Sequence, residues 1–126
     1  MILVDTSVWI DHFRRADALL AALLEDQQAA THPFVLGELA CGNLSNRAEI
    51  LTLMRALPSA PCANTDEMIV FIEKYGLHGK GIGFIDAHLL AAAVLEPGTQ
   101  LWTRDKCLHA VARELNLAFN ERTRRR

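Results

Sequence analysis

The chain has 126 residues, of which 51% are hydrophobic and 22% are charged, which fits one ordinary globular domain and excludes a mostly disordered chain. Its formal net charge of -2 would fall to -6 without the four arginines near the C-terminus, which are Arg122, Arg124, Arg125 and Arg126. An acidic body is unusual for a protein that binds nucleic acid through bulk charge alone, so its acidic residues need another explanation.

Short apolar segments at four places in the chain predict β-strands, at Ile2–Val4 and at residues 28–31, 60–62 and 100–103. Between them, apolar residues recur at helical spacing, and we expect helices near residues 19–24, 33–39, 50–57, 64–75, 85–93 and 108–115. Pro33 suits a first helical turn, and Asn64 with Glu67 is typical of a capping box. Because strands alternate with helices, we expect an α/β fold with a parallel sheet covered on both faces.

Three cysteines, Cys41, Cys62 and Cys107, stand far apart in the sequence and form no zinc-binding pattern. We expect them to be buried apolar thiols in a reducing compartment. The apolar run at Ile2–Val4 is too short for a signal peptide, and no stretch approaches the length of a membrane span. We therefore expect a cytoplasmic protein without a membrane segment.

Two aspartates follow predicted strands. Asp5 comes directly after Ile2–Val4, and Asp105 lies two residues beyond the segment at 100–103. If these strands are parallel, both side chains lie at the same edge of the sheet, where ligands bind in such folds. Each could instead cap a helix or occupy a turn. For Asp5, however, Thr6 and Ser7 could already provide the cap.

Two further acids stand alone in apolar helical segments. Glu38 is surrounded by small and apolar residues, and Asp86 opens the strongly apolar segment 85–93. A charge in such surroundings rarely stays buried without a partner or a metal. The alternatives are a solvated helix face for Glu38 and an interaction with the helix dipole for Asp86.

Several carboxylates brought together repel one another unless a cation offsets their charge. Carboxylate oxygens suit Mg²⁺ or Mn²⁺ rather than zinc, and Mg²⁺ usually keeps waters and adds phosphate oxygens. Those properties suit phosphodiester hydrolysis, in which one or two metal ions activate water and stabilise the leaving oxygen.

The arrangement of these acids resembles the PIN-domain family over residues 2–117. The matching segments are ILVDTSVWI at 2–10, Glu38 in its helix, IDAHLLA at 85–91 and TRD at 103–105. The segments HPFVLGEL at 32–39 and GIGFID at 81–86 look specifically like VapC-type toxins of bacterial toxin–antitoxin pairs.

The resemblance implies a three-layer α/β/α sandwich with a central parallel sheet, formed by residues 1–119, with a basic tail at residues 120–126. It also implies a Mg²⁺- or Mn²⁺-dependent endoribonuclease that cleaves structured RNA, tRNA or rRNA, and so inhibits translation. The metal-binding and catalytic roles fall on Asp5, Glu38, Asp86 and Asp105, with the Thr103 hydroxyl beside them. The expected partners are the RNA substrate, a second copy of the chain and an antitoxin that places a basic side chain in the acidic pocket. Apolar residues that could receive the antitoxin are Trp9, Phe13 and Leu44, although we expect each to be in the core.

Basic side chains near the predicted edge could hold RNA phosphates, or they could be ordinary surface charges. They are Arg14, Arg15, Lys80, Arg104 and Lys106. The glycine-rich segment around Lys80 does not fit a nucleotide-binding motif and is interpreted as a turn that positions Asp86. We expect His12 and His88 to be structural or surface residues. The arginine-rich tail could contact RNA or be a disordered end.

Three other interpretations remain. A phosphorelay receiver would need an aspartate after a middle strand, and the region at residues 60–63 contains none. A haloacid-dehalogenase-type phosphatase would need a second aspartate two residues after Asp5, where Ser7 stands. A degenerate PIN domain that only binds a partner is disfavoured because all four acids are present.

Overall fold

A three-stranded parallel sheet forms the centre of the protein, in a computed structural model that describes residues 1–124. The strands are β1 (Ile2–Val4), β2 (Ala29–Ala30) and β3 (Gln100–Trp102), in the order β2-β1-β3. Ile2 is paired with Ala29 on one side and with Gln100 on the other. The predicted parallel sheet is therefore confirmed, with its first strand at the centre.

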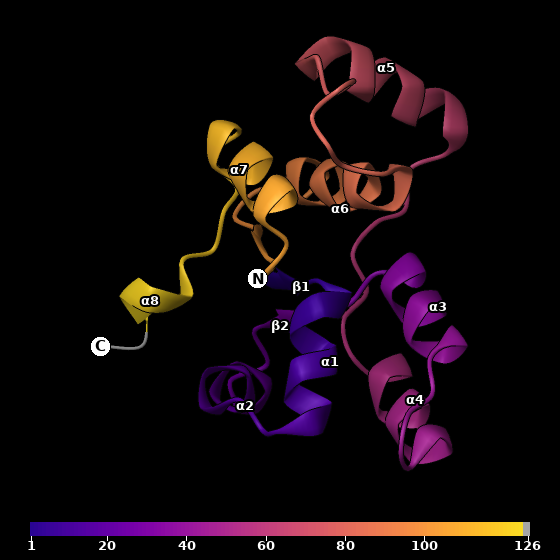
Figure 1. The fold of residues 1–126 in the computed structure, drawn as a ribbon, viewed down its shortest axis with the longest axis vertical. Coiled ribbons are helices and arrows are strands. Elements are labelled where there is room, and N and C mark those ends of the chain that lie inside the picture. The colour runs from indigo at the N-terminus through magenta and orange to yellow at the C-terminus, as the bar shows by residue number, and fades with distance from the viewer. Residues whose placement is uncertain (125–126) are drawn as a thin grey trace.

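Helices lie on both sides of this sheet, which gives the expected three-layer α/β/α sandwich. In Figure 1, α1 and α2 lie on one side of β1 and β2, and α6 and α7 lie on the other. The helices are α1 (Thr6–Arg14), α2 (Ala18–Glu25), α3 (Pro33–Cys41), α4 (Arg47–Arg55), α5 (Thr65–Tyr75), α6 (Phe84–Leu95), α7 (Lys106–Glu114) and α8 (Glu121–Arg124).

The core is built around β1, whose three residues are all buried. Such a strand is hydrophobic at every position because helices cover both faces of a parallel sheet. Trp9 on α1 is also in the core, and its Nε1 donates a hydrogen bond to the carbonyl of Val4 at 3.1 Å. The expectation of core burial is confirmed for Trp9, whereas Phe13 and Leu44 are only partly buried.

The predicted strand at residues 60–62 is wrong. Ser59 forms only an isolated parallel bridge with Thr31, and the amide of Ala60 donates to the Thr31 carbonyl at 2.7 Å. Pro61 has no amide proton, so the ladder cannot continue through it. The segment still runs beside the end of β2, and it brings Cys62 close to His32, the N-cap of α3.

Two helix starts follow the sequence signals. α3 begins at Pro33, and the Asn64 side chain accepts from the Glu67 amide at 2.8 Å in the predicted capping box of α5. The opposite end of α5 is capped by Gly76 with φ of +60°, a conformation that glycine adopts without strain.

The expectation of buried cysteines is wrong, because Cys41, Cys62 and Cys107 are all exposed and free. They lie at a helix end, in a loop and in a first helical turn. Among the residues that the structure describes, no helix is long and apolar enough to cross a membrane. Residues 121–124 of the predicted basic tail form α8, while Arg125 and Arg126 lie outside the described residues.

Candidate active site

The carboxyl ends of β1 and β3 bring Asp5 and Thr103 together. These neighbouring strands are parallel, with Val4 opposite Trp102, and the next residue of each chain segment faces the same edge of the sheet. The Thr103 hydroxyl donates to Oδ2 of Asp5 at 2.7 Å, and both residues are buried. The sequence-based placement of the site at this edge is consistent with the topology.

Asp5 occupies the N-cap position of α1 but makes no capping hydrogen bond with its side chain. Instead, Oδ2 accepts from two hydroxyls, those of Ser7 and Thr103, each at 2.7 Å. Only 7% of Asp5 is exposed. The capping alternative for Asp5 therefore fails, and its carboxylate is fixed by two donors that leave Oδ1 facing other groups.

The other three acids come from three separate helices. Glu38 on α3 accepts from the Thr6 hydroxyl at 2.9 Å through Oε1. Asp86 in the first turn of α6 accepts from the Gly83 amide at 3.2 Å through Oδ2. Asp105 caps α7, and its Oδ1 accepts from the Leu108 amide at 2.9 Å. Asp105 thus plays the capping role that was its structural alternative, but it does so with one oxygen only.

Electrostatic interactions place the other three acids in the neighbourhood of Asp86. Burial raises the pKa of Asp86 above its ordinary value, the Gly83 amide opposes this, and the charges of Asp5, Asp105 and Glu38 raise the pKa further. A carboxyl group responds in this way only to anions close to it. The structure therefore brings together all four acids that the sequence singled out.

The four carboxylates have a common pattern of hydrogen bonding. Each uses one oxygen for the protein contacts given above, and within residues 1–124 the second oxygen has no hydrogen-bond donor. One oxygen of each group is thereby held in place while the other is available. Such an arrangement can bind a hard divalent cation through oxygen.

Sequence reasoning missed the roles of Thr6 and Ser7. Both were regarded as potential helix caps, yet Thr6 orients Glu38 and Ser7 orients Asp5. Ser7 also accepts from the Arg104 amide at 3.1 Å, which ties α1 to the segment after β3. The signal in the sequence was two hydroxyl residues directly after Asp5. The hydrogen-bond partners of these hydroxyls depend on contacts with distant segments, which the sequence pattern does not contain.

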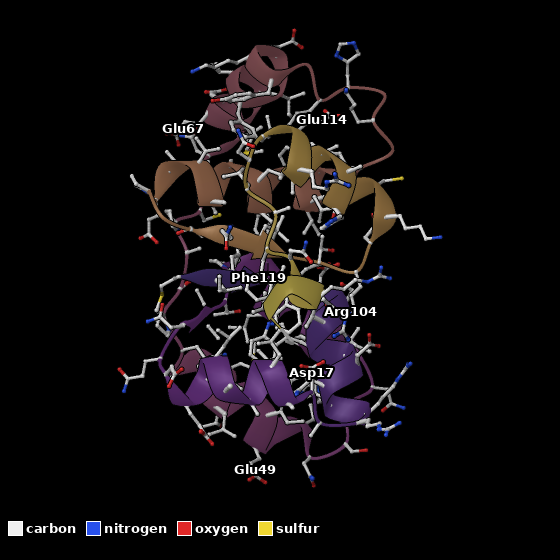
Figure 2. The ribbon with its side chains drawn as sticks, turned by 90° about the vertical axis from the view of Figure 1, so that its left-hand side faces the viewer. Asp17, Glu49, Glu67, Arg104, Glu114 and Phe119 are labelled. Atoms are coloured by element: carbon white, nitrogen blue, oxygen red, sulfur yellow. The ribbon has the colours of Figure 1, made fainter. Side chains whose placement is uncertain are left out.

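Arg104 does not face a free surface. Its guanidinium contacts Asp11 at 2.8 Å, Asp17 at 2.9 Å and Glu121 at 3.1 Å, and it lies over the Trp102 ring. Figure 2 shows Arg104 beside Asp17, close to α8. Because the Arg104 guanidinium is already paired with three carboxylates, we do not retain Arg104 as an RNA contact.

The other predicted basic residues are on the surface. Arg14 and Arg15 are exposed at the end of α1, and Lys106 is exposed in the first turn of α7, next to Asp105. Lys80 makes a solvent-exposed ion pair with Glu114 at 3.4 Å. Such a pair contributes little stability, so Lys80 is available to other anions.

Two of the five histidines were singled out from the sequence, and neither hydrogen-bonds to the four acids. His12 accepts from the Asp17 amide at 2.9 Å through Nδ1, and burial lowers its pKa. His88 is buried and packs edge-on against Phe34 and Phe84. Their expected structural roles are consistent with these contacts.

A groove of about 530 Å³ lies between α1 and the region joining α3 and α4, and Glu38 is among the residues that line it. Its apolar wall includes Ile10, Phe13 and Leu44, and Arg14 lies at its edge. A second hollow of about 410 Å³ lies beside Asp105 and is lined by Thr103 and Lys106 among others. The acidic site is thus flanked by two surfaces that could hold a larger molecule.

Comparison with known proteins gives consistent results. The model of the PIN domain family matches residues 2–114. The chain is 46% identical over 121 residues to Ribonuclease VapC32 of Mycobacterium tuberculosis, covering 96% of this chain and 98% of that protein. It is 29% identical over 130 residues to VapC ribonuclease Mb1587 of Mycobacterium bovis, covering 93% and 96%. The crystal structure of PAE2754 from Pyrobaculum aerophilum has a similar fold, with a TM-score of 0.63, 19% identity and coverage of 97% and 90%.

Proposed function

This chain belongs to the PIN-domain family as a VapC-like ribonuclease toxin, and from that membership we propose that it is a Mg²⁺- or Mn²⁺-dependent endoribonuclease that cleaves structured RNA, tRNA or rRNA, to inhibit translation. The observation that carries the proposal is the raised pKa of Asp86. Burial is its largest cause, and the charges of Asp5, Asp105 and Glu38 add to it. A cation would offset the repulsion that these neighbouring acids exert on Asp86. We place this activity in the cytoplasm, where translation occurs.

The residues of the site fit a hard divalent ion. All four side chains offer oxygen, the ligand that Mg²⁺ and Mn²⁺ prefer, and none offers the sulfur or nitrogen typical of zinc. Asp5, Glu38, Asp86 and Asp105 would hold the ion, directly or through water. When bound, such an ion activates a water molecule and stabilises the negative charge that develops on the phosphate.

The protein itself contributes preorganisation. Ser7 and Thr103 hold Asp5, Thr6 holds Glu38 and a backbone amide holds Asp86. Because these donors fix the carboxylates before any substrate arrives, little reorganisation is needed during the reaction. Fixed orientation of ligands through such contacts usually supports both affinity and rate.

Phosphate contacts would come from exposed basic residues around the site. Lys106 is adjacent to Asp105 in sequence and lines the same hollow, while Arg14 lies at the edge of the groove that begins at Glu38. Arg15 and Lys80 are exposed farther along the surface. Contacts of this kind supply affinity without reading the base sequence, so they position the RNA backbone across the acids.

The groove between α1 and α3 is our candidate site for the antitoxin. Its lining combines the partly buried apolar residues Ile10, Phe13 and Leu44 with Glu38. An apolar segment with a following arginine or lysine would fill the groove and compete with the metal for the acids. We also propose that the protein forms a homodimer. The exposed apolar residues Ile69, Val70 and Phe84 on α5 and α6 are suited to such an interface.

A direct test is the cleavage of a mixed pool of structured RNAs by the purified protein during a Mg²⁺ titration. We expect cleavage that rises with Mg²⁺, stops in EDTA and is absent from Asp86→Asn. Intact RNA at every Mg²⁺ and Mn²⁺ concentration would leave only the binding-module interpretation.

A further inference from the structure

A second set of metal-ligating side chains lies in this fold and shares no residue with the four acids. It consists of His32, Cys62 and His88, and one ligand atom from each, a ring nitrogen or the thiol sulfur, lies within 4.8 Å of the other two. His32 follows β2, His88 is on α6 and Cys62 is in the loop after α4. The bridge between Thr31 and Ser59 brings that loop to the end of β2.

The two imidazoles have polar atoms that the rest of the protein leaves unsatisfied. His32 is 0% and His88 is 4% exposed, and neither Nε2 of His32 nor Nδ1 of His88 has a hydrogen-bond partner among residues 1–124. Buried polar atoms in native proteins almost always have a partner, either a protein group, a water or an ion. Two residues of one three-residue cluster therefore have a buried ring nitrogen that could bind an ion or a water.

We propose that His32, Cys62 and His88 form a binding site for a borderline or soft transition-metal ion such as Zn²⁺. Imidazole nitrogen and thiolate sulfur are both ligands that zinc takes in proteins, and three protein ligands leave a fourth position for water. This set differs from the oxygen ligands of the active site, so the two sites select different ions.

The protonation state of His32 suits this role. Burial, and then the charge of His88, lowers the pKa of His32 to about 4. The ring is therefore neutral near pH 7, as a metal ligand must be. Cys62 is exposed, so its side of the cluster provides the route by which an ion enters.

Metal binding has a structural consequence at α3. The Phe34 amide donates to Nδ1 of His32 at 3.0 Å, so in the metal-free protein Nε2 carries the ring proton. Coordination through Nε2 moves this proton to Nδ1, breaks the hydrogen bond from Phe34 and releases the thiol proton of Cys62 to solvent. Metal binding thus removes the His32 side-chain cap of α3 and links the start of α3 to α6. These are the helices that carry Glu38 and Asp86.

The test uses Co²⁺ as a spectroscopic substitute for Zn²⁺ in the full-length protein. A bond between Co²⁺ and a thiolate gives a charge-transfer absorption that carboxylates do not give. We expect this band in the wild type and in Cys107→Ser, which removes an exposed thiol outside the cluster. Added Zn²⁺ should abolish the band because it displaces Co²⁺. Cys62→Ser should lack the band, with Zn²⁺ affinity lower by at least about tenfold. Asp86→Asn should keep the band, which separates this site from the active site.

A second measurement follows the amide of Phe34 by NMR during a Zn²⁺ titration. We expect its protection from hydrogen exchange to fall as the His32 and His88 ring resonances shift. The proposal is overturned if the wild type shows no thiolate band, if Cys62→Ser keeps it, or if Zn²⁺ leaves the Phe34 and histidine resonances unchanged. Failure of RNA cleavage would not affect these readouts.

Discussion

Thr103 donates a hydrogen bond of 2.7 Å to Asp5 across 98 residues of sequence. The same oxygen of Thr103 accepts from the Asp105 amide at 3.1 Å. One buried hydroxyl therefore connects two acids that follow different strands and precede different helices. This contact also fixes the positions of these acids at the edge of the sheet.

Replacing this hydroxyl tests its positioning role. Thr103→Val keeps the side-chain shape but removes the donor to Asp5, so we expect RNA cleavage and Mg²⁺ affinity to fall by about 10- to 100-fold. The measurement is the cleavage rate as a function of Mg²⁺ concentration, together with circular dichroism to check the fold. An unchanged Mg²⁺ dependence would show that Thr103 does not orient Asp5.

Thr31→Val is the matched control for that variant. The Thr31 hydroxyl is buried and has no partner in the described part of the chain, so its removal relieves the cost of an unsatisfied polar atom. We expect unchanged cleavage and a free energy of unfolding higher by about 1 kcal/mol. A threonine-to-valine change is thus expected to have opposite consequences at the two positions.

Asp86→Asn tests the mutual repulsion of the acids. The variant should lose RNA cleavage, whereas in EDTA its melting temperature should exceed that of the wild type by a few degrees, on the order expected for a change of about 1 kcal/mol. The reason is that burial and three neighbouring anions disfavour the charged form of Asp86 and raise its pKa.

The pH dependence of this effect has a definite sign. A raised pKa in the folded state means that the folded protein binds more protons, so the stability contribution of Asp86 is lost as pH rises above 3.8, the ordinary value. The advantage of Asp86→Asn in EDTA should therefore grow from pH 4 to 7, and Mg²⁺ should reverse it. Asp26→Asn, at the exposed end of α2, serves as the control and should change neither quantity. A lower melting temperature of Asp86→Asn in EDTA would contradict the repulsion.

The acids of the site were predictable because their surroundings in the sequence are unusual. Asp5 and Asp105 follow strands, and Glu38 and Asp86 interrupt apolar helices, so each can be recognised locally. Whether they meet depends on the order of strands, and here the central position of β1 beside β3 provides it. Hydrophobic periodicity alone does not predict the order of the strands, and the resemblance to a known family supplied that order.

Other features depended on tertiary contacts that a sequence pattern does not contain. Arg104 looked like an RNA contact because it stands beside Asp105, but Asp17, Asp11 and Glu121 approach it from distant segments. The failed strand at residues 60–62 is different, because its cause is local: Pro61 has no amide proton and ends the ladder.

Arg104→Gln tests the structural assignment of this arginine. The substitution removes the positive charge that pairs with three carboxylates and lies over the Trp102 ring. We therefore expect the free energy of unfolding to fall by about 1–3 kcal/mol. Lys106→Gln should instead weaken RNA binding and reduce its salt dependence, with stability changed by less than about 0.5 kcal/mol. Denaturant unfolding and RNA titration at several salt concentrations measure both. Wild-type stability of Arg104→Gln with weaker RNA binding would restore the original interpretation.

His32→Asn tests the pH dependence that follows from the buried imidazole. The pKa of His32 falls from 6.5 to about 4 in the folded protein, mainly through burial, so between these values the unfolded chain takes up a proton that the folded chain does not. The stability contribution of the neutral ring is complete above pH 6.5 and is lost as pH falls toward 4. Asparagine also caps helices, so it can replace the acceptor for Phe34 without titrating. In EDTA, we expect the free energy of unfolding to decrease less steeply from pH 6.5 to 4 in His32→Asn than in the wild type or in His78→Asn, an exposed control. Parallel pH profiles for all three proteins would show that His32 is not kept neutral by its burial.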